Sequence, residues 1–258
     1  MQDWNPELYL RFAGERTRPA LELLSRISHP APIAITDLGC GPGNSTELLH
    51  QAWPQARVTG VDNSSAMLQQ ARQRLPGCTF QEADIASWQP DTPQDIIYAN
   101  ASLQWLPAHD QLLPALIEHL TLGGVLAVQM PDTLSQPTHQ LMRKIAAEGP
   151  WWERFGDVDK VRQALLSTGQ YYDLLVSHGC DVDIWHTTYY HVMSGPQAII
   201  EWLKGTGLRP FLAELNEQEQ QDFLQQYQLG LQTAYPAQAD GNSLLTYPRL
   251  FMVATKRQ

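Results

Sequence analysis

The sequence of 258 residues is poor in cysteine and contains no long apolar run. Its three cysteines, Cys40, Cys78 and Cys180, are odd in number and irregularly spaced, which excludes a fully paired disulfide framework and favours a reducing compartment. No cysteine and histidine residues are grouped at the spacing of a zinc site, so we expect no metal. No apolar run approaches the roughly 20 residues that a membrane span needs, so we expect no membrane partner.

Basic charge is also scarce, with 17 Lys and Arg against 27 Asp and Glu and a formal net charge of -10. Binding of duplex nucleic acid requires a basic face, so we expect no nucleic-acid partner. The first residues lack the apolar core of a signal peptide and carry an acid at Asp3, which favours a cytoplasmic location. No heptad pattern or long apolar helix face stands out, so we expect a monomer.

What is present is the composition of a globular protein, with 43% hydrophobic and 17% charged residues. Up to residue 130, short apolar runs alternate with helical patterns. Strands are predicted at residues 32–38, 57–62, 78–83, 95–99 and 123–130, and helices at 44–53, 64–75 and 111–120. This alternation predicts an α/β fold, doubly wound, with a mostly parallel sheet that is covered by helices on both faces.

The pattern changes after residue 131. Residues 132–181 are mainly helical, 183–192 read as a sixth strand, 196–235 return to helix, and 249–255 form a last strand. We therefore expect one domain over residues 1–258, with helical cap elements at 1–28, 132–181 and 194–246 that form a lid over the sheet.

The most informative motif is the glycine-rich run DLGCGPG at residues 37–43, between a strand and a helix. Glycines let the backbone turn tightly and approach a ligand closely, and the amides at the start of the following helix face that ligand. Asp62 ends the next strand, 23 residues after Gly39. An acid at that place typically accepts the hydroxyls of a ribose.

Two cofactor interpretations compete for this motif. A dinucleotide fingerprint needs a third glycine at position 44, where this chain has Asn44. The spacing G-x-G-x-G after Asp37 resembles instead the first motif of class I S-adenosylmethionine-dependent methyltransferases. Asp84 after the third strand and the run NASLQW at residues 100–105 after the fourth also resemble that superfamily. The resemblance implies a Rossmann-like sheet of seven strands with an antiparallel last strand, S-adenosylmethionine as cofactor and S-adenosylhomocysteine as product.

The resemblance also assigns roles to residues. Asp37 would orient the methionine end of the cofactor, Asp62 would accept the ribose hydroxyls and Asp84 the adenine amino group. Arg16 or Arg18 would reach the cofactor carboxylate or the substrate, and Met67 is equally well a core residue. The expected cofactor-binding set consists of Arg16, Asp37, Gly39, Cys40, Gly41, Asp62, Asn63, Met67, Asp84, Ile85, Asn100, Ala101 and Ser102.

Other motifs resemble a single family, the trans-aconitate 2-methyltransferases, along the whole chain. They include the opening WNP at residues 4–6, TGLRP at 206–210 and YPRLFMVA at 247–254. The family transfers a methyl group from S-adenosylmethionine to one carboxylate of trans-aconitate and gives a monomethyl ester. The resemblance therefore implies carboxyl methylation of a small tricarboxylate.

This reaction makes particular demands on the residues. A carboxylate is already ionised at pH 7, so we expect catalysis by positioning and water exclusion, without a general base. A trianion calls for arginine, whose planar donors match a carboxylate pairwise, and 13 of the 17 basic residues are arginine. The expected substrate-binding residues are Tyr9, Gln104, Trp105, Arg209 and Arg249. Which of Tyr189, Tyr190 and His191 faces the pocket stays open.

Four alternatives remain open. A methyltransferase for malonyl thioesters of an acyl carrier protein would need a basic docking face, which an acidic chain does not favour. A nucleic-acid amino methyltransferase usually carries Asn/Asp-Pro-Pro-aromatic after the fourth strand, where this chain reads NASL at residues 100–103. A non-catalytic S-adenosylmethionine-binding protein and a nicotinamide dehydrogenase share the expected fold, and fold alone does not separate them.

Overall fold

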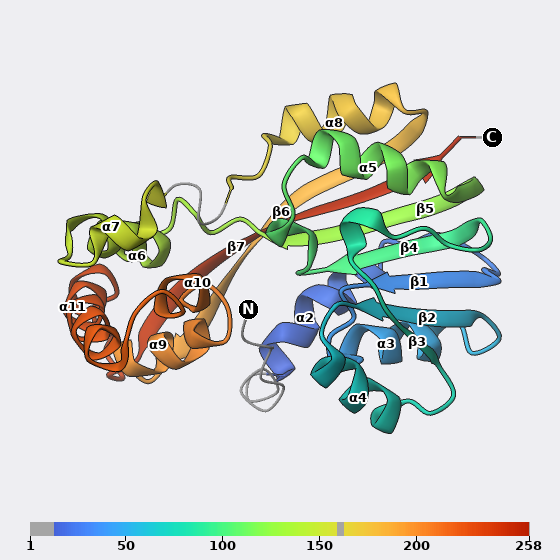
Figure 1. Cartoon of the computed structure of the whole chain (residues 1–258). Helices are drawn as coiled ribbons and strands as arrows, with labels where there is room; N and C mark the ends of the chain where they lie inside the picture. The colour runs from blue at the N-terminus through green and yellow to red at the C-terminus, as the bar shows by residue number, and fades with distance from the viewer. Residues whose placement is uncertain (1–12, 159–162, 258) are drawn as a thin grey trace. The chain divides into compact units, whose positions relative to one another are not determined.

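The computed structural model describes residues 13–158 and 163–257, except for the side chains of residues 13, 15 and 16 (Figure 1). Seven strands form one sheet in the order β3-β2-β1-β4-β5-β7-β6. Their bounds are β1 (Ala34–Leu38), β2 (Arg57–Asp62), β3 (Thr79–Glu82), β4 (Gln94–Asn100), β5 (Leu120–Pro131), β6 (Cys180–Met193) and β7 (Ser243–Lys256). Strands β1 to β5 pair in parallel and the last strands are antiparallel. The predicted fold class is therefore confirmed.

The described helices account for most of the remaining chain. They are α2 (Ala13–Leu24), α3 (Asn44–Ala52), α4 (Ser65–Arg74), α5 (His109–Glu118), α6 (Pro137–Glu148), α7 (Trp152–Phe155), α8 (Thr168–Ser177), α9 (Pro196–Lys204), α10 (Arg209–Leu212) and α11 (Glu217–Ala234), with single 3-10 turns η1 (Ile85–Ser87) and η2 (Leu103–Trp105). Among these helices none is long and apolar enough to cross a bilayer.

The chain divides into two compact units. The described part of the larger unit comprises residues 13–130, 165–186 and 250–257, and that of the smaller unit comprises 131–158, 163–164 and 187–249. Strands β5, β6 and β7 contribute residues to both units. The sheet and its parallel strands thus belong mainly to the larger unit.

The core of the larger unit follows from strands that are covered on both faces. All five residues of β1 are buried, as expected for a central parallel strand. On one face, Leu38 and Ile97 pack in a single cluster with Leu113 of α5 and Tyr171 of α8. On the other face, the hydroxyl of Tyr98 donates a hydrogen bond of 2.7 Å to the carbonyl oxygen of Ala20. That bond fixes α2 against the sheet, where it also packs on α3.

The smaller unit is built around α11, whose buried residues Phe223, Tyr227 and Leu231 lie four apart on one helical face. The ring of Phe223 lies 5.7 Å from that of Trp151, and the hydroxyl of Tyr227 donates to the carbonyl oxygen of Thr138 over 3.2 Å. These contacts join α11 to α6 and to the turn before α7. The unit therefore has an aromatic core of its own.

The predicted strands and helices before residue 131 are all present, with ends shifted by a few residues. The largest difference concerns β7, which begins at Ser243, whereas the sequence predicts a strand only from residue 249. Pro248 explains the error, because a proline cannot donate to the hydrogen-bond ladder and normally argues against the middle of a strand. Here β7 continues through Pro248, whose carbonyl oxygen accepts a bond from the amide of Asp132.

Candidate active site

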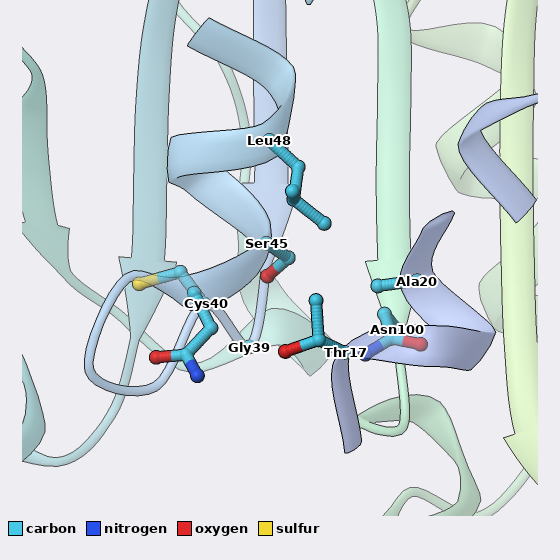
Figure 2. Close-up of a pocket in the computed structure, with 8 residues that line it drawn as sticks. Thr17, Ala20, Gly39, Cys40, Ser45, Leu48 and Asn100 are labelled. Carbon is cyan, nitrogen blue, oxygen red and sulfur yellow. The ribbon is translucent and has the colours of Figure 1, made fainter. Parts of the chain in front are cut away.

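The candidate site lies where the strand order reverses, between β1 and β4, which is where open α/β sheets bind ligands. The loops that follow these two strands meet there and form a pocket with α2 and the start of α3 (Figure 2). The pocket is shallow and open to solvent. It is lined by Thr17, Ala20, Gly39, Cys40, Asn44, Ser45, Leu48 and Asn100.

Gly39 brings the two loops into contact. Its φ of 72° lies in the left-handed region, and a Cβ at this position would lie 2.3 Å from the Cβ of Ser102. Ser102 in turn donates a hydrogen bond of 2.7 Å from its hydroxyl to the carbonyl oxygen of Leu38. A glycine is therefore required for the backbone conformation and for the close approach.

Asp62 at the end of β2 is tied to the same loop. One carboxylate oxygen accepts from the amide of Gly41 and the other from the amide of Ser64, each over 2.9 Å. These bonds fix the orientation of the carboxylate. The contact of Asp62 with ribose hydroxyls stays a prediction.

Asp37 lies beneath the glycine loop and is completely buried. Its Oδ2 accepts hydrogen bonds of 2.7 Å from the hydroxyls of Ser45 and Thr46 at the start of α3, and its Oδ1 is buried without a hydrogen-bond partner. Burial raises the pKa of Asp37 to about 6, the two hydroxyls lower it, and the charge of Asp62 raises it further. The carboxylate thus anchors the first turn of α3 and keeps one oxygen without a donor.

The loop after β4 also contains oxygens that lack donors. Asn100 Oδ1 and Gln104 Oε1 are both buried without a partner, while Gln104 Nε2 donates to the carbonyl oxygen of Ala101 over 2.7 Å. Ala101 itself has a φ of 55°, which is unusual outside glycine. The loop is therefore held in a strained conformation that presents acceptors. These hydrogen-bond acceptors fit a ligand group that donates, such as an ammonium, and do not fit a carboxylate, which only accepts.

The expected adenine side of the site is more open. Asp84 is exposed and accepts a bond of 2.9 Å from the amide of Ala86, so it caps η1. Ile85 is half-buried, and its Cδ1 would lie 3.5 Å from a Cβ at Gly39. Asn63 is exposed, whereas Met67 is buried in the first turn of α4. The structure thus brings Ile85 next to the glycine loop.

The expected substrate-binding residues are spread over the chain. Tyr9 and the side chain of Arg16 lie outside the described residues. Trp105 is half-buried on η2 in the larger unit. Arg209 is half-buried at the start of α10, and Arg249 is buried on β7, both in the smaller unit.

Burial alternates along β6 at the three residues whose orientation the sequence leaves open. Tyr189 and His191 are buried on one face, and Tyr190 between them is exposed. Tyr190 is thus the solvent-facing residue of the three.

Five pocket residues were not predicted from the sequence, namely Thr17, Ala20, Asn44, Ser45 and Leu48. Asn44 and Ser45 begin the helix whose first amides the sequence places toward the ligand, and the hydroxyl of Ser45 donates to Asp37. Thr17 and Ala20 belong to α2, which comes to the pocket only because Tyr98 holds this helix on the sheet. No local motif marks them.

Two residues with reactive side chains are held in structural roles. His109 is buried, with Nδ1 2.6 Å from the hydroxyl of Tyr171 and Nε2 2.9 Å from the carbonyl oxygen of Leu103. Burial raises the pKa of the Cys40 thiol, and the charges of Asp37 and Asp62 raise it further, so this cysteine is not activated as a nucleophile. Among the described residues, no three His, Cys, Asp or Glu side chains are grouped so as to hold a metal ion.

Replacing Gly39 by alanine tests the contact between the two loops. We expect the left-handed backbone alone to cost about 1–2 kcal/mol, and the new Cβ to push Ser102 away and weaken binding of S-adenosylmethionine. Calorimetric titration and denaturant unfolding measure both effects. The control is Gly77→Ala, since Gly77 has no atom within 4 Å of the added Cβ. Native cofactor affinity in Gly39→Ala would contradict the assigned role.

The buried carboxylate of Asp37 predicts a pH dependence of stability. Its pKa rises from 3.8 to about 6 on folding, so the folded state holds this proton more tightly than the unfolded state. The stability of the wild type relative to Asp37→Asn should therefore fall by about 2 kcal/mol as the pH rises from 4 to 7. Urea unfolding of the ligand-free proteins at several pH values measures it.

The matched control is Asp240→Asn, because Asp240 is exposed and hydrogen bonds from Asn242 lower its pKa below this range. The difference in the free energy of unfolding between the wild type and Asp240→Asn should not change between pH 4 and 7. If the difference between the wild type and Asp37→Asn also did not change with pH, the Asp37 carboxylate would be hydrated in solution and the prediction would be wrong.

Comparison with known proteins places the chain in a family. The family model described as "Methyltransferase domain" matches residues 35–124. The trans-aconitate 2-methyltransferase of Yersinia pestis (strain Pestoides F) is 56% identical over 254 residues, which cover 98% of this chain and 98% of the relative. The enzyme of the same name from Escherichia coli O45:K1 is 55% identical over 258 residues and covers 100% of both chains.

Solved structures agree with the fold. A phosphoethanolamine N-methyltransferase 2 of Haemonchus contortus, in complex with S-adenosylhomocysteine, is similar with a TM-score of 0.55 and 20% identity. The match covers 93% of this chain and 53% of the Haemonchus chain, so this chain spans about half the length of that protein. An S-adenosylmethionine-dependent methyltransferase of Mesorhizobium loti has a TM-score of 0.53 and 18% identity, and the match covers 94% of this chain and 99% of the Mesorhizobium chain. With relatives more than half identical along nearly its whole length, the chain belongs to the trans-aconitate 2-methyltransferase family.

Proposed function

We propose that the protein transfers a methyl group from S-adenosylmethionine to one carboxylate of trans-aconitate and forms the monomethyl ester. The observation that carries this proposal is the extent of the identity, which covers 98% to 100% of the chain. It includes the smaller unit, beyond the residues 35–124 that the general methyltransferase family matches. Structures that share the fold at 18% to 20% identity support the fold alone.

The residues of the pocket fit the proposed cofactor. The glycine loop offers a cradle that a Cβ would fill, and Asp62 is oriented at the end of β2 to accept ribose hydroxyls. Asn100 Oδ1 is a buried acceptor without a donor on the pocket wall, which suits the cofactor's ammonium group. When bound, the cofactor supplies an electrophilic methyl group on a sulfonium.

The remaining cofactor contacts stay predictions. We assign Asp84, Asn63, Met67 and Ile85 to the adenine side, and Arg16 to the cofactor carboxylate. The orientation of the Gln104 amide supports a contact with the ammonium end of the cofactor in place of the predicted contact with the substrate. Tyr9, Trp105, Arg209 and Arg249 remain candidates for the substrate. The capping role of residues 1–28, 132–181 and 194–246, the cytoplasmic location and the monomeric state also remain predictions.

We further propose that the reaction needs no general base. The attacking carboxylate is ionised at neutral pH, so no proton has to be removed from it. His109, the histidine nearest in sequence to the loop after β4, has both ring nitrogens engaged. The chain's own residues then act by orienting the two reactants and excluding water.

A methyl-transfer assay tests the proposed function. Methyl-labelled S-adenosylmethionine is offered with trans-aconitate, cis-aconitate, citrate, isocitrate or a malonyl thioester, and base-labile label is counted as ester. We expect label on trans-aconitate above the other acids. Preferential label on the malonyl thioester would instead favour the carrier-protein alternative, and bound cofactor without transfer to any acid would favour a non-catalytic binding protein.

The absence of a general base predicts a level pH profile. The rate of methyl transfer at saturating substrates should change by less than about 2-fold between pH 7 and 9, because no catalytic group ionises in that range. Initial rates with trans-aconitate in overlapping buffers measure it. A rise in rate with a midpoint in this range that disappears on replacing one histidine, cysteine or acid would identify a base and refute the mechanism.

A further inference from the structure

The loop after β4, residues 101–108, is held in a strained conformation at both ends. Ala101 has a φ of 55° and Ala108 a φ of 56°, and these are the two residues other than glycine with a positive φ in the described part of the chain. A left-handed backbone is unfavourable for an alanine and persists only where the surrounding structure fixes it. The contacts that fix this loop therefore determine what it can present to a ligand.

Polar contacts fix the backbone of this loop at both ends. The amide of Ala101 donates to the carbonyl oxygen of Gln129 on β5 over 2.8 Å. Nε2 of His109, directly after the loop, lies 2.9 Å from the carbonyl oxygen of Leu103. This carbonyl belongs to the same peptide plane as the amide nitrogen of Gln104, so its orientation determines where the side chain of Gln104 begins. His109 thereby helps to fix Gln104.

Tyr171 of α8 in turn fixes the ring of His109. The two residues are 0% and 7% exposed, and the hydroxyl of Tyr171 lies 2.6 Å from Nδ1 of His109. A carbonyl oxygen only accepts, so in the neutral ring Nε2 donates to Leu103 and Nδ1 accepts from the hydroxyl. The hydroxyl also accepts from the amide of Leu166 over 3.4 Å. Helices α5 and α8 lie side by side in the larger unit, which brings the two rings together (Figure 1).

The surroundings of this hydrogen-bonded pair are apolar. Tyr171 and Leu103 belong to one core cluster with Leu113 of α5 and Leu175 of α8. Apolar residues of the same shape would pack there with nearly the same stability, because a buried hydrogen bond replaces bonds to water and gains little. A hydrogen-bonded pair adds direction, since it is satisfied in only one arrangement. The pair therefore specifies the position of the loop and contributes little to stability.

We propose that His109 and Tyr171 are positioning residues for the ammonium end of the cofactor. They hold the loop after β4 so that the amide oxygens of Asn100 and Gln104, both buried without a donor, stay where that group can donate to them. The inference rests on the proposed function for the contact of these oxygens with the ammonium group. Without the pair the loop relaxes, the fraction of molecules that can bind falls, and the apparent Kd of the cofactor rises by the same factor.

The variant Tyr171→Phe tests the proposal, because it removes the hydroxyl and keeps the ring. Titration calorimetry measures the Kd of S-adenosylhomocysteine, which carries the ammonium group, and of 5′-methylthioadenosine, which lacks the whole amino-acid end. We expect the Kd of S-adenosylhomocysteine to rise roughly 5- to 10-fold and that of 5′-methylthioadenosine to stay within about 2-fold. The control Tyr172→Phe removes the hydroxyl of the next residue, which is 46% exposed, and should change neither Kd.

Variants of His109 separate the hydrogen bonds from the packing. In His109→Gln a single amide can still donate to Leu103 and accept from Tyr171, whereas His109→Leu can do neither. We expect the Kd of S-adenosylhomocysteine to rise at least as much in His109→Leu as in Tyr171→Phe, and to rise less in His109→Gln. Thermal unfolding shows whether each variant is folded, and Tyr171→Phe with His109→Gln carry the comparison if His109→Leu is not.

A double-mutant cycle tests whether the pair acts through the loop. Gln104→Met removes one acceptor at similar volume, so Tyr171→Phe should weaken binding of S-adenosylhomocysteine less in that background than in the wild type. Fully additive losses would overturn the proposal, as would an equal fall in affinity for both ligands or unchanged affinity in Tyr171→Phe and His109→Leu.

None of these titrations requires turnover. If the wild type methylates no acid, the proposed function fails, yet a loss of affinity that is confined to S-adenosylhomocysteine still supports the positioning role of His109 and Tyr171.

Discussion

The site depends on the close approach of Gly39 to Ser102. Strands β1 and β4 are neighbours, and from them the chain continues to β2 on one side of the sheet and to β5 on the other. The loops after β1 and β4 approach so closely that a side chain at Gly39 would collide with Ser102. Once they meet, Ser102 is bonded to Leu38 and the glycine loop is bonded to Asp62 at the end of β2. Three strand ends are thereby joined into one rigid edge, which can hold a ligand in a fixed place.

Below this edge, several polar groups are arranged at a cost to stability. Asp37 is buried with one oxygen lacking a donor, Asn100 and Gln104 each bury an amide oxygen in the same condition, and Ala101 adopts a left-handed backbone. Most buried polar groups in proteins have partners, so an accumulation of exceptions in two adjacent loops points to a ligand with donors. The cationic methionine end of S-adenosylmethionine has that chemistry.

The sequence predicted those parts of the fold that local patterns determine. Strands β1 to β5 and the helices between them follow from short apolar runs and helical spacing, and the glycine loop was found from its motif. The start of β7 was missed because Pro248 normally breaks a strand. Thr17 and the division into two units were not predictable, because they depend on which distant residues pack together, as Tyr98 does with Ala20.

Among the described residues, the two units differ in the charge of the groups that they bury, Asp37 in the larger unit and Arg249 in the smaller. The larger unit buries Asp37 and keeps Asp62 beside it, which suits a cofactor with a sulfonium and an ammonium group. In the smaller unit the guanidinium of Arg249 lies over the rings of Tyr189 and Tyr247, whose faces attract a cation. The buried charges of the two units therefore have different kinds of contact, hydroxyl hydrogen bonds for Asp37 and aromatic faces for Arg249.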